Sequence, residues 1–278
     1  MFINRNHILL HVVRLSDLVI VKLGGSVITH KEQSPPQTNQ ELLIRIAKEL
    51  KVHSGRLVII LGGGAHGHQA AHKFGFGDDT TPRRRLLEGV PEIRHNMTML
   101  SNDVEEALSA EGIPAVVFSP FNNAKMQDGQ LLEFPTHLIQ HALDAGHVVV
   151  THGDVCFDET RGASILSGET ITVHLAKILK AKRILIGTNV DGVLEEDPNV
   201  NPDTQHIPII SSSNKEKVLH SAGPSGSTDV TGGMNRKITE LFELVHEHST
   251  IAIFNLKVPG RLLGLLEGTE VICTRILL

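Results

Sequence analysis

Short apolar runs rich in β-branched residues recur along the chain, and they constrain its fold more than any other feature. They lie at residues 18–23, 57–61, 115–118, 148–151, 184–187, 251–255 and 271–277. Most are apolar throughout rather than at alternate positions, which is typical of strands covered on both faces. We therefore expect a three-layer α/β/α sandwich with a mainly parallel central sheet.

Helical patterns separate several of these runs. Residues 92–110 and 234–247 each place apolar side chains on one helical face. Residues 154–168 differ, because the short β-type runs VCF and ASIL flank the turn-rich DETRG, which predicts a β-hairpin. Two turn-rich segments, 75–85 and 195–203, are expected to be surface loops, and the first contains three consecutive arginines.

The composition of the chain argues against some classes of binding partner. The net charge is -5, no basic block occurs, and Trp and Tyr are absent, so we expect no nucleic-acid partner. No apolar run reaches the roughly 18 residues of a membrane-spanning helix. We expect a small-molecule partner instead. The two cysteines, Cys156 and Cys273, lie far apart and indicate a reducing compartment, so a cytoplasmic location is expected. Residues 1–17 are expected to form an N-terminal extension before a single domain at 18–278.

The first predicted strand ends in a phosphate-binding pattern. In VKLGGSVITHK, Lys22 is followed by Gly24, Gly25 and Ser26, which places an ammonium group beside backbone N–H groups that a polyanion can approach closely. Lys31 can face the same charged centre if the chain turns between the two lysines. The sequence contains no P-loop motif. The alternative is two ordinary surface lysines.

The second predicted strand ends in GGGAHGHQ, where Gly62, Gly64 and Gly67 match the dinucleotide fingerprint G-x-G-x-x-G. That fingerprint also requires an acid at the end of a following strand to hold the ribose. Here Asp78 and Asp79 lie in a segment that predicts no strand, so a dehydrogenase is not favoured. Glycine turns after two consecutive strands instead suggest two phosphate-bearing ligands.

A third glycine pattern lies at DVTGGMNRK, where Thr231, Gly232 and Gly233 open the predicted helix at 234–247 and Lys237 follows one turn later. Free N–H groups at a helix N-terminus attract anions. Three phosphate-binding elements with nearby lysines are the equipment of phosphoryl transfer, whose catalysis consists mostly of positioning and charge neutralisation.

Six motifs in order resemble the amino acid kinase superfamily, and within it the isopentenyl phosphate kinases. They are VKLGGSVITHK, GGGAHGH, THGDVCFD, SGETITVHLA, TNVDGV and DVTGGMNRK. The most specific are the I-T-x-K after the first glycine turn and the histidine that closes GGGAHGH. The resemblance implies ATP-dependent phosphorylation of isopentenyl phosphate, Mg²⁺, a homodimer, a mainly substrate-binding lobe at 18–167 and a mainly nucleotide-binding lobe at 168–278.

The resemblance also implies roles for individual residues. Lys31 would stabilise the phosphoryl group in flight, and Glu169 would orient the lysines. The acceptor would contact Gly63, His68 and Gly153. The residues implied on the nucleotide side are Lys22, Gly24, Gly25, Ser26, Gly64, Asp191, Gly233 and Lys237.

One residue departs from the family pattern, because the usual S-G-D is S-G-E here and carries Glu169. The extra methylene moves the carboxylate by roughly 1.5 Å, enough to disturb a reacting geometry. Glu169→Asp is therefore expected to keep or raise kcat. The extension at 1–17 is also unlike the family.

Two other functions remain open from the sequence, and metal binding was also considered. A fosfomycin kinase shares the histidine at position 68, and a non-catalytic nucleotide-binding protein would tolerate Glu169. His68 and His72 are spaced to share a helix face, but no HExxH motif and no ligand-spaced cysteine pair or acid accompanies them, so we expect no metal site in the protein itself.

Overall fold

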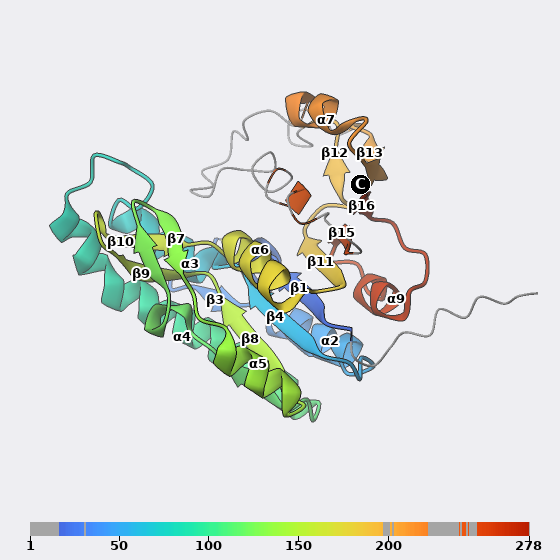
Figure 1. Cartoon of the computed structure of the whole chain (residues 1–278), viewed down its shortest axis with the longest axis horizontal. Coiled ribbons are helices and arrows are strands. Elements are labelled where there is room, and N and C mark those ends of the chain that lie inside the picture. Colours follow the sequence, from blue (N-terminus) through green and yellow to red (C-terminus); the bar gives the residue numbers. More distant parts are fainter. Residues whose placement is uncertain are drawn as a thin grey trace, which may run out of the picture.

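The computed structural model describes residues 17–30, 32–196, 201, 203–221, 239, 241–242, 244 and 249–277. Its largest sheet has eight strands in the order β14-β16-β15-β11-β1-β4-β8-β5 (Figure 1). These strands are β1 Val19–Leu23, β4 Leu57–Leu61, β5 Ala115–Val117, β8 Val148–His152, β11 Arg183–Thr188, β14 Ile209–Ile210, β15 Thr250–Asn255 and β16 Thr274–Ile276. The pairing of β15 with β16 is antiparallel and the others in this sheet are parallel, which confirms the mainly parallel prediction.

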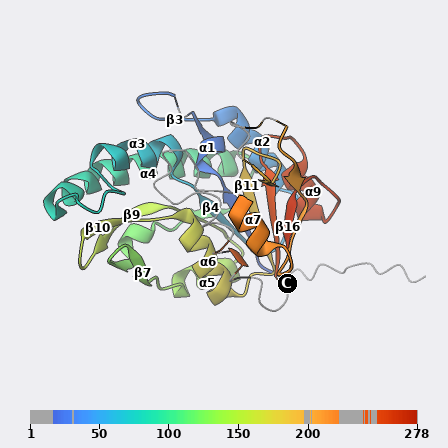
Figure 2. The same cartoon turned by 90° about the horizontal axis from the view of Figure 1, so that it is seen from above.

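Helices cover both faces of this sheet and give the expected three layers (Figure 2). One face packs against α2 Gln40–Leu50, α3 Gly64–Lys73, α4 Arg83–Ala110 and α9 Arg261–Glu267, and the other against α5 His137–Asp144 and α6 Gly168–Leu179. Within β1, Val19 and Val21 point into the core on the side of α2, α3, α4 and α9. Ile20 points into the core on the side of α5 and α6. Since both faces are buried, β1 has no polar alternation, as the sequence indicated.

Smaller elements surround this core. A four-stranded sheet has the order β10-β9-β6-β7, and two short pairs join β2 to β3 and β12 to β13. The antiparallel pairing of β9 with β10 confirms the hairpin predicted at 154–168. The bounds are α1 Gly25–Ile28, β2 Thr29–His30, β3 Gln37–Thr38, η1 Pro120–Asn122, β6 Lys125–Gln127, β7 Gln130–Glu133, β9 Asp154–Asp158, β10 Gly162–Leu166, β12 Val193–Leu194, β13 His206–Ile207 and α7 Lys215–Ser221.

The helix predicted at 92–110 begins earlier than expected. It starts at Arg83 and continues through Pro91, so the arginine run expected in a loop forms the first turn of α4. The apolar spacing that predicts this helix begins at Ile93, so the sequence pattern did not reveal the earlier turns. The helix predicted at 234–247 lies mostly outside the described residues, as does part of the loop predicted at 195–203.

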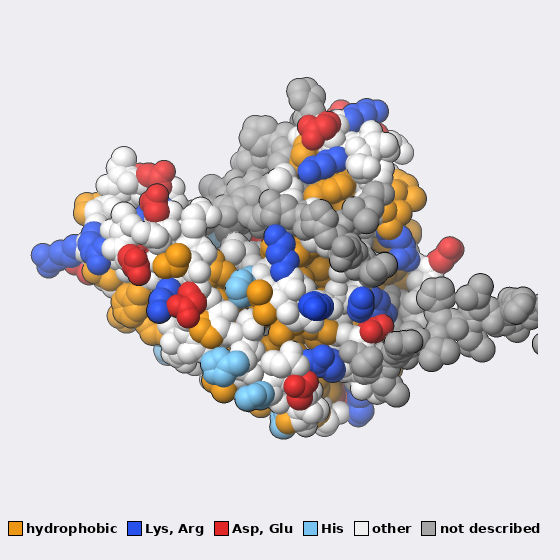
Figure 3. Space-filling view, viewed as in Figure 1, with side chains coloured by type: hydrophobic (Ala, Val, Ile, Leu, Met, Phe, Trp, Pro, Cys, Tyr) orange, Lys and Arg blue, Asp and Glu red, His pale blue; other side chains and the backbone are white. Residues whose placement is uncertain are grey.

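Charged side chains of both signs are spread over the face of the molecule in Figure 3. Within the described part of the chain, no helix combines the length and the apolar character needed to cross a membrane.

Candidate active site

Lys22 lies one residue before the end of β1, and its ammonium group is paired inside the protein. Its side chain is 6 % exposed, and Nζ lies 2.9 Å from Oε1 of Glu169 near the start of α6. Glu169 therefore reaches the lysine with its longer side chain. An ammonium group carries three N–H donors, so Lys22 can bind Glu169 and an anion together.

The glycine turns after β1 and β4 touch each other through their backbones. A Cβ atom placed on Gly25 would lie 2.2 Å from Gly64 N, and one on Gly62 would lie 2.6 Å from Gly25 N. The N–H of Gly62 donates to Leu23 O at 2.9 Å. Because no side chain fits between the two turns, they form one continuous surface of main-chain atoms, of the kind that accepts phosphate groups.

The Thr29 side chain bridges these two turns by hydrogen bonds. Its hydroxyl donates to Gly25 O at 2.7 Å and accepts from Ala65 N at 2.9 Å, so it satisfies one of the first N–H groups of α3. Gly64 is in the left-handed region at φ +50, and a Cβ atom there would lie 2.3 Å from Thr29 Oγ1. Thr29 belongs to the I-T-x-K motif, but the sequence did not indicate this role.

Gly153 and the start of α6 complete the same end of the sheet. Gly153 follows β8 directly, and its N–H donates to Leu61 O at 2.9 Å. A Cβ atom on Gly153 would lie 3.0 Å from Gly168 N, and one on Gly168 would lie 3.4 Å from Lys22 Cε. The carboxyl ends of β1, β4 and β8 therefore bring Lys22, both glycine turns, Gly153 and Glu169 together, where ligands collect in open α/β sheets.

The two histidines of the second turn have different surroundings. His68 is exposed on α3, the helix whose N-cap residue is Gly63. His66 is buried, and burial lowers its pKa, although Asp103 acts in the opposite direction. His68 therefore lies at the surface near the start of α3, whereas His66 is part of the packing.

Asp191 follows the carboxyl end of β11, the strand that pairs with β1. Its Oδ1 accepts from Arg261 Nη1 at 2.6 Å and from Asn255 Nδ2 at 3.1 Å. The hydrogen bond from Arg261 lowers the pKa of Asp191, and the bond from Asn255 acts in the same direction. Ser26 is half-buried in α1. Lys31, Gly233 and Lys237 lie outside the described residues.

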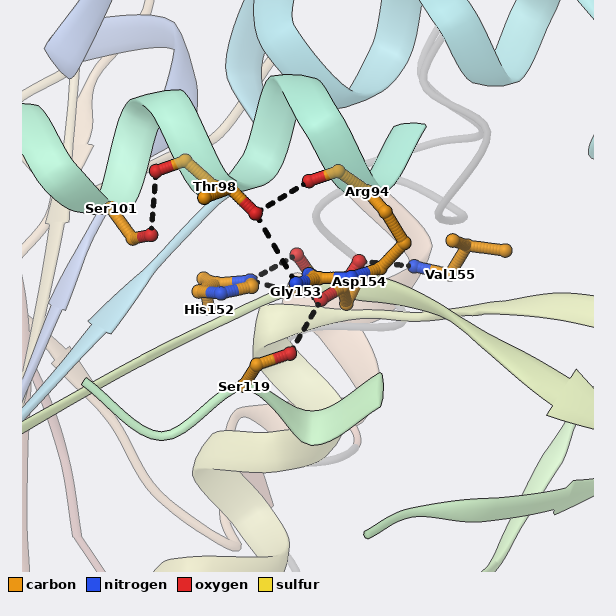
Figure 4. Close-up of polar contacts among 8 residues, drawn as sticks. All are labelled: Arg94, Thr98, Ser101, Ser119, His152, Gly153, Asp154 and Val155. Atoms are coloured by element: carbon orange, nitrogen blue, oxygen red, sulfur yellow. Dashed lines mark hydrogen bonds and ion pairs between the residues drawn. The ribbon is translucent and has the colours of Figure 1, made fainter. Parts of the chain in front are cut away.

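A buried polar cluster behind Gly153 was not identified from the sequence. Arg94 from α4 and Ser119 reach Asp154 from opposite sides (Figure 4). Arg94 Nη1 forms an ion pair with Asp154 Oδ2, and Ser119 Oγ donates to the same oxygen at 3.3 Å. The available signal was the HGD triplet, since an acid directly after a predicted substrate glycine requires a partner if it is buried.

Burial controls the ionisation of this cluster. It raises the pKa of Asp154 to about 7, against the effect of the Arg94 charge. It lowers the pKa of the adjacent His152 to about 4. His152 Nδ1 lies 3.1 Å from Gly153 O. Because the imidazole is neutral at neutral pH and a carbonyl oxygen only accepts, Nδ1 carries the hydrogen and donates a hydrogen bond to Gly153 O.

The described residues contain no group of three or more His, Cys, Asp or Glu side chains arranged to hold a metal ion. The main-chain surface and Lys22 instead fit anionic oxygens. The arrangement is thus suited to two phosphate-bearing ligands that meet at the joined glycine turns.

Comparison with known proteins agrees with this geometry. The sequence profile of the amino acid kinase family matches residues 17–255. An isopentenyl phosphate kinase from Methanothermobacter thermautotrophicus is 36 % identical over 93 % of this chain and 98 % of its own length. One from Methanocaldococcus jannaschii is 34 % identical over 91 % of this chain and 98 % of its own.

A solved structure of an isopentenyl phosphate kinase superposes with a TM-score of 0.80 at 34 % identity, over 93 % of this chain and 99 % of that one. The chain is therefore a small-molecule kinase, and its fold is that of these enzymes. It belongs to the amino acid kinase family and, within that family, to the isopentenyl phosphate kinases.

Proposed function

We propose that this enzyme transfers the γ-phosphoryl group of ATP to the phosphate of isopentenyl phosphate. An oxygen of the acceptor phosphate forms the new bond to phosphorus as the bond to ADP breaks, which gives isopentenyl diphosphate and ADP without a covalent enzyme intermediate. The observation that carries this proposal is the Lys22–Glu169 pair beside two glycine turns in direct contact.

The two turns would hold the two reactants. The turn at Gly24, Gly25 and Ser26, with Lys22, would bind ATP phosphates, and Gly63 with Gly153 would face the acceptor. Their contact supports a short distance between donor and acceptor, which transfer requires. Lys31 would neutralise charge on the group in flight, and Gly64, Asp191, Gly233 and Lys237 would contribute to the nucleotide side.

His68 would bind the acceptor phosphate. A phosphate monoester carries about two negative charges near neutral pH, and the γ-phosphoryl group is also anionic. A histidine supplies a hydrogen-bond donor and, when a phosphate raises its pKa, a positive charge. The exposed position of His68 on α3, one turn beyond Gly64, supports this role.

We also propose Mg²⁺ as the counter-ion of ATP. With no three-ligand cluster among the described residues, phosphate oxygens and water would supply most of its ligands, as is usual for nucleotide-bound Mg²⁺. When bound, the ion would neutralise phosphate charge. A cytoplasmic location is proposed because both cysteines are free thiols, and a homodimer because the sequence resembles enzymes of that kind.

The test is release of ADP from ATP and Mg²⁺ with a panel of acceptors: isopentenyl phosphate, dimethylallyl phosphate, longer prenyl phosphates and fosfomycin. We expect turnover with isopentenyl phosphate. Turnover with fosfomycin alone would identify a phosphonate kinase instead. ATP binding without acceptor-dependent turnover would identify a non-catalytic nucleotide-binding protein.

A further inference from the structure

Both main-chain polar groups of Gly153 are engaged within the protein. Its N–H donates to Leu61 O at 2.9 Å, and its carbonyl oxygen accepts from His152 Nδ1 at 3.1 Å. The peptide groups around Gly153 are therefore fixed on both sides.

His152 is in turn held by a chain of contacts that leads to α4. Its Nδ1 lies 3.4 Å from Asp154 Oδ2, and this oxygen forms the ion pair with Arg94. The other carboxylate oxygen accepts from Val155 N at 2.9 Å. Asp154 is fully buried, so its bonds to Arg94 and to Val155 N replace those that water would otherwise make.

Arg94 itself has little freedom. Its Nη2 donates to Thr98 Oγ1 at 3.3 Å, and its guanidinium group lies 5.2 Å from the centre of the Phe121 ring. One turn further along α4, Met97 Sδ lies 3.7 Å from the position of a Cβ atom on Gly63. The same helix thus supports both glycines assigned to the acceptor.

We propose that Arg94, Asp154 and His152 act together as positioning residues, which hold the Gly153 turn in the geometry that accepts the acceptor phosphate. None of the three needs to touch the substrate. The inference rests on the proposed function, because it takes Gly153 to face the acceptor. It adds a connection from α4 to the acceptor site that the kinase reaction alone does not require.

The test compares KM for the acceptor with KM for ATP. His152→Leu removes the donor to Gly153 O, and we expect acceptor KM to rise at least tenfold while ATP KM changes less than twofold. In His152→Asn the amide nitrogen takes the place of Nδ1, so acceptor KM should stay within about threefold of wild type. A purely structural effect would lower the amount of folded enzyme and leave both KM values unchanged.

If His152→Leu fails to fold, Arg94→Gln tests the same series of contacts from its partly exposed end. It should also raise acceptor KM at least tenfold, and Arg94→Lys should raise it less. Arg84→Gln on the exposed side of α4 is the matched control and should change neither KM. If the three residues act as one unit, Arg94→Gln combined with His152→Leu should raise acceptor KM little more than the larger single effect.

Three results would overturn the positioning role: unchanged acceptor KM in Arg94→Gln, equal losses in His152→Asn and His152→Leu, or fully multiplicative effects in the double variant. Wild-type turnover is measured first in the same assay. Absence of wild-type turnover with isopentenyl phosphate would reject the proposed function, whereas normal wild-type turnover with unchanged variant KM values would reject the positioning role alone.

Discussion

At the scale of single residues, the contact between Lys22 and Glu169 changes how the glutamate should be understood. From sequence, the longer side chain is expected to disturb the lysines. The 2.9 Å separation of Nζ and Oε1 instead corresponds to an ordinary ion pair. The pair is largely buried, where loss of one partner leaves an uncompensated charge.

We therefore expect Glu169→Asp to lower kcat by about tenfold, the reverse of the expectation from sequence. Shortening the side chain withdraws the carboxylate by roughly 1.5 Å and opens its contact with Lys22. Steady-state ADP release measures the change, and Glu169→Gln, which keeps the length but not the charge, is the companion variant. Normal kcat in Glu169→Asp would mean that Lys22 follows the shorter side chain.

His68→Ala should lower kcat/KM for isopentenyl phosphate at least tenfold, about 1.4 kcal/mol of transition-state stabilisation. The KM for ATP should barely change, because the lost donor is proposed to serve the acceptor phosphate. His72→Ala, exposed one turn further along α3, is the control and should behave as wild type. Near-normal turnover of His68→Ala would remove this histidine from the mechanism.

Sequence indicated the residues of this site that follow predicted strands, because parallel strands end at a common edge. Lys22, Gly25 and Gly64 were predicted in that way, and Gly153 through the resemblance to the family. The contacts of Arg94 with Asp154 were not, since they join a helix to a turn far away in sequence and no motif spacing encodes them. A threonine such as Thr29 is common in any strand, and its link between two turns becomes visible only when they are packed together.

At the scale of elements, the central strands were predicted well and the boundaries less well. Long apolar runs are unambiguous, so β1, β4 and β8 lie within a residue of their predicted positions. The start of α4 was misplaced because the apolar spacing that predicts it begins at Ile93, whereas the helix extends back through Pro91 to Arg83. The short strand β14 has too few residues for a periodic signal.

One contact between elements predicts a large effect on stability. Glu49 near the end of α2 is buried, and its carboxylate accepts from Gly260 N at 3.1 Å and Leu263 N at 3.0 Å at the start of α9. Glu49→Ala leaves these N–H groups without their acceptor and should lower the free energy of unfolding by about 1–3 kcal/mol.

Urea denaturation would measure this difference. Glu41→Ala, exposed in the first turn of the same helix, is the control, and its free energy of unfolding should stay within about 0.5 kcal/mol of wild type. Equal losses in the two variants would show that the contact with α9 contributes nothing specific.

At the scale of the whole molecule, the pH dependence of folding should contain two opposing contributions from one cluster. Asp154 has a folded pKa of about 7, above its ordinary value of 3.8, so its contribution is present below pH 3.8 and is lost as pH rises through 7. His152 has a folded pKa of about 4, below 6.5, so its contribution is present above pH 6.5 and is lost as pH falls through 4.

A variant that lacks either ionisable group should show the pH dependence contributed by the other. Relative to wild type, Asp154→Asn should gain stability as pH rises from about 5 to about 7, and His152→Asn should lose stability over the same window. Urea denaturation at both pH values measures these changes. Slopes of the same sign in both variants would contradict the assignment of the two protonation states.

The contact between the glycine turns also links ligand binding to folding. The turns follow β1 and β4, which pair in parallel only after the intervening chain, with α1 and α2, has crossed back over the sheet. While these strands are unpaired, the two glycine turns are not in contact. A ligand that needs both turns therefore binds the folded state alone. At about 100 times its Kd such a ligand would add about 2.7 kcal/mol to folding. Nucleotide in the cell would then raise the free energy of unfolding of this enzyme, besides serving as its reactant.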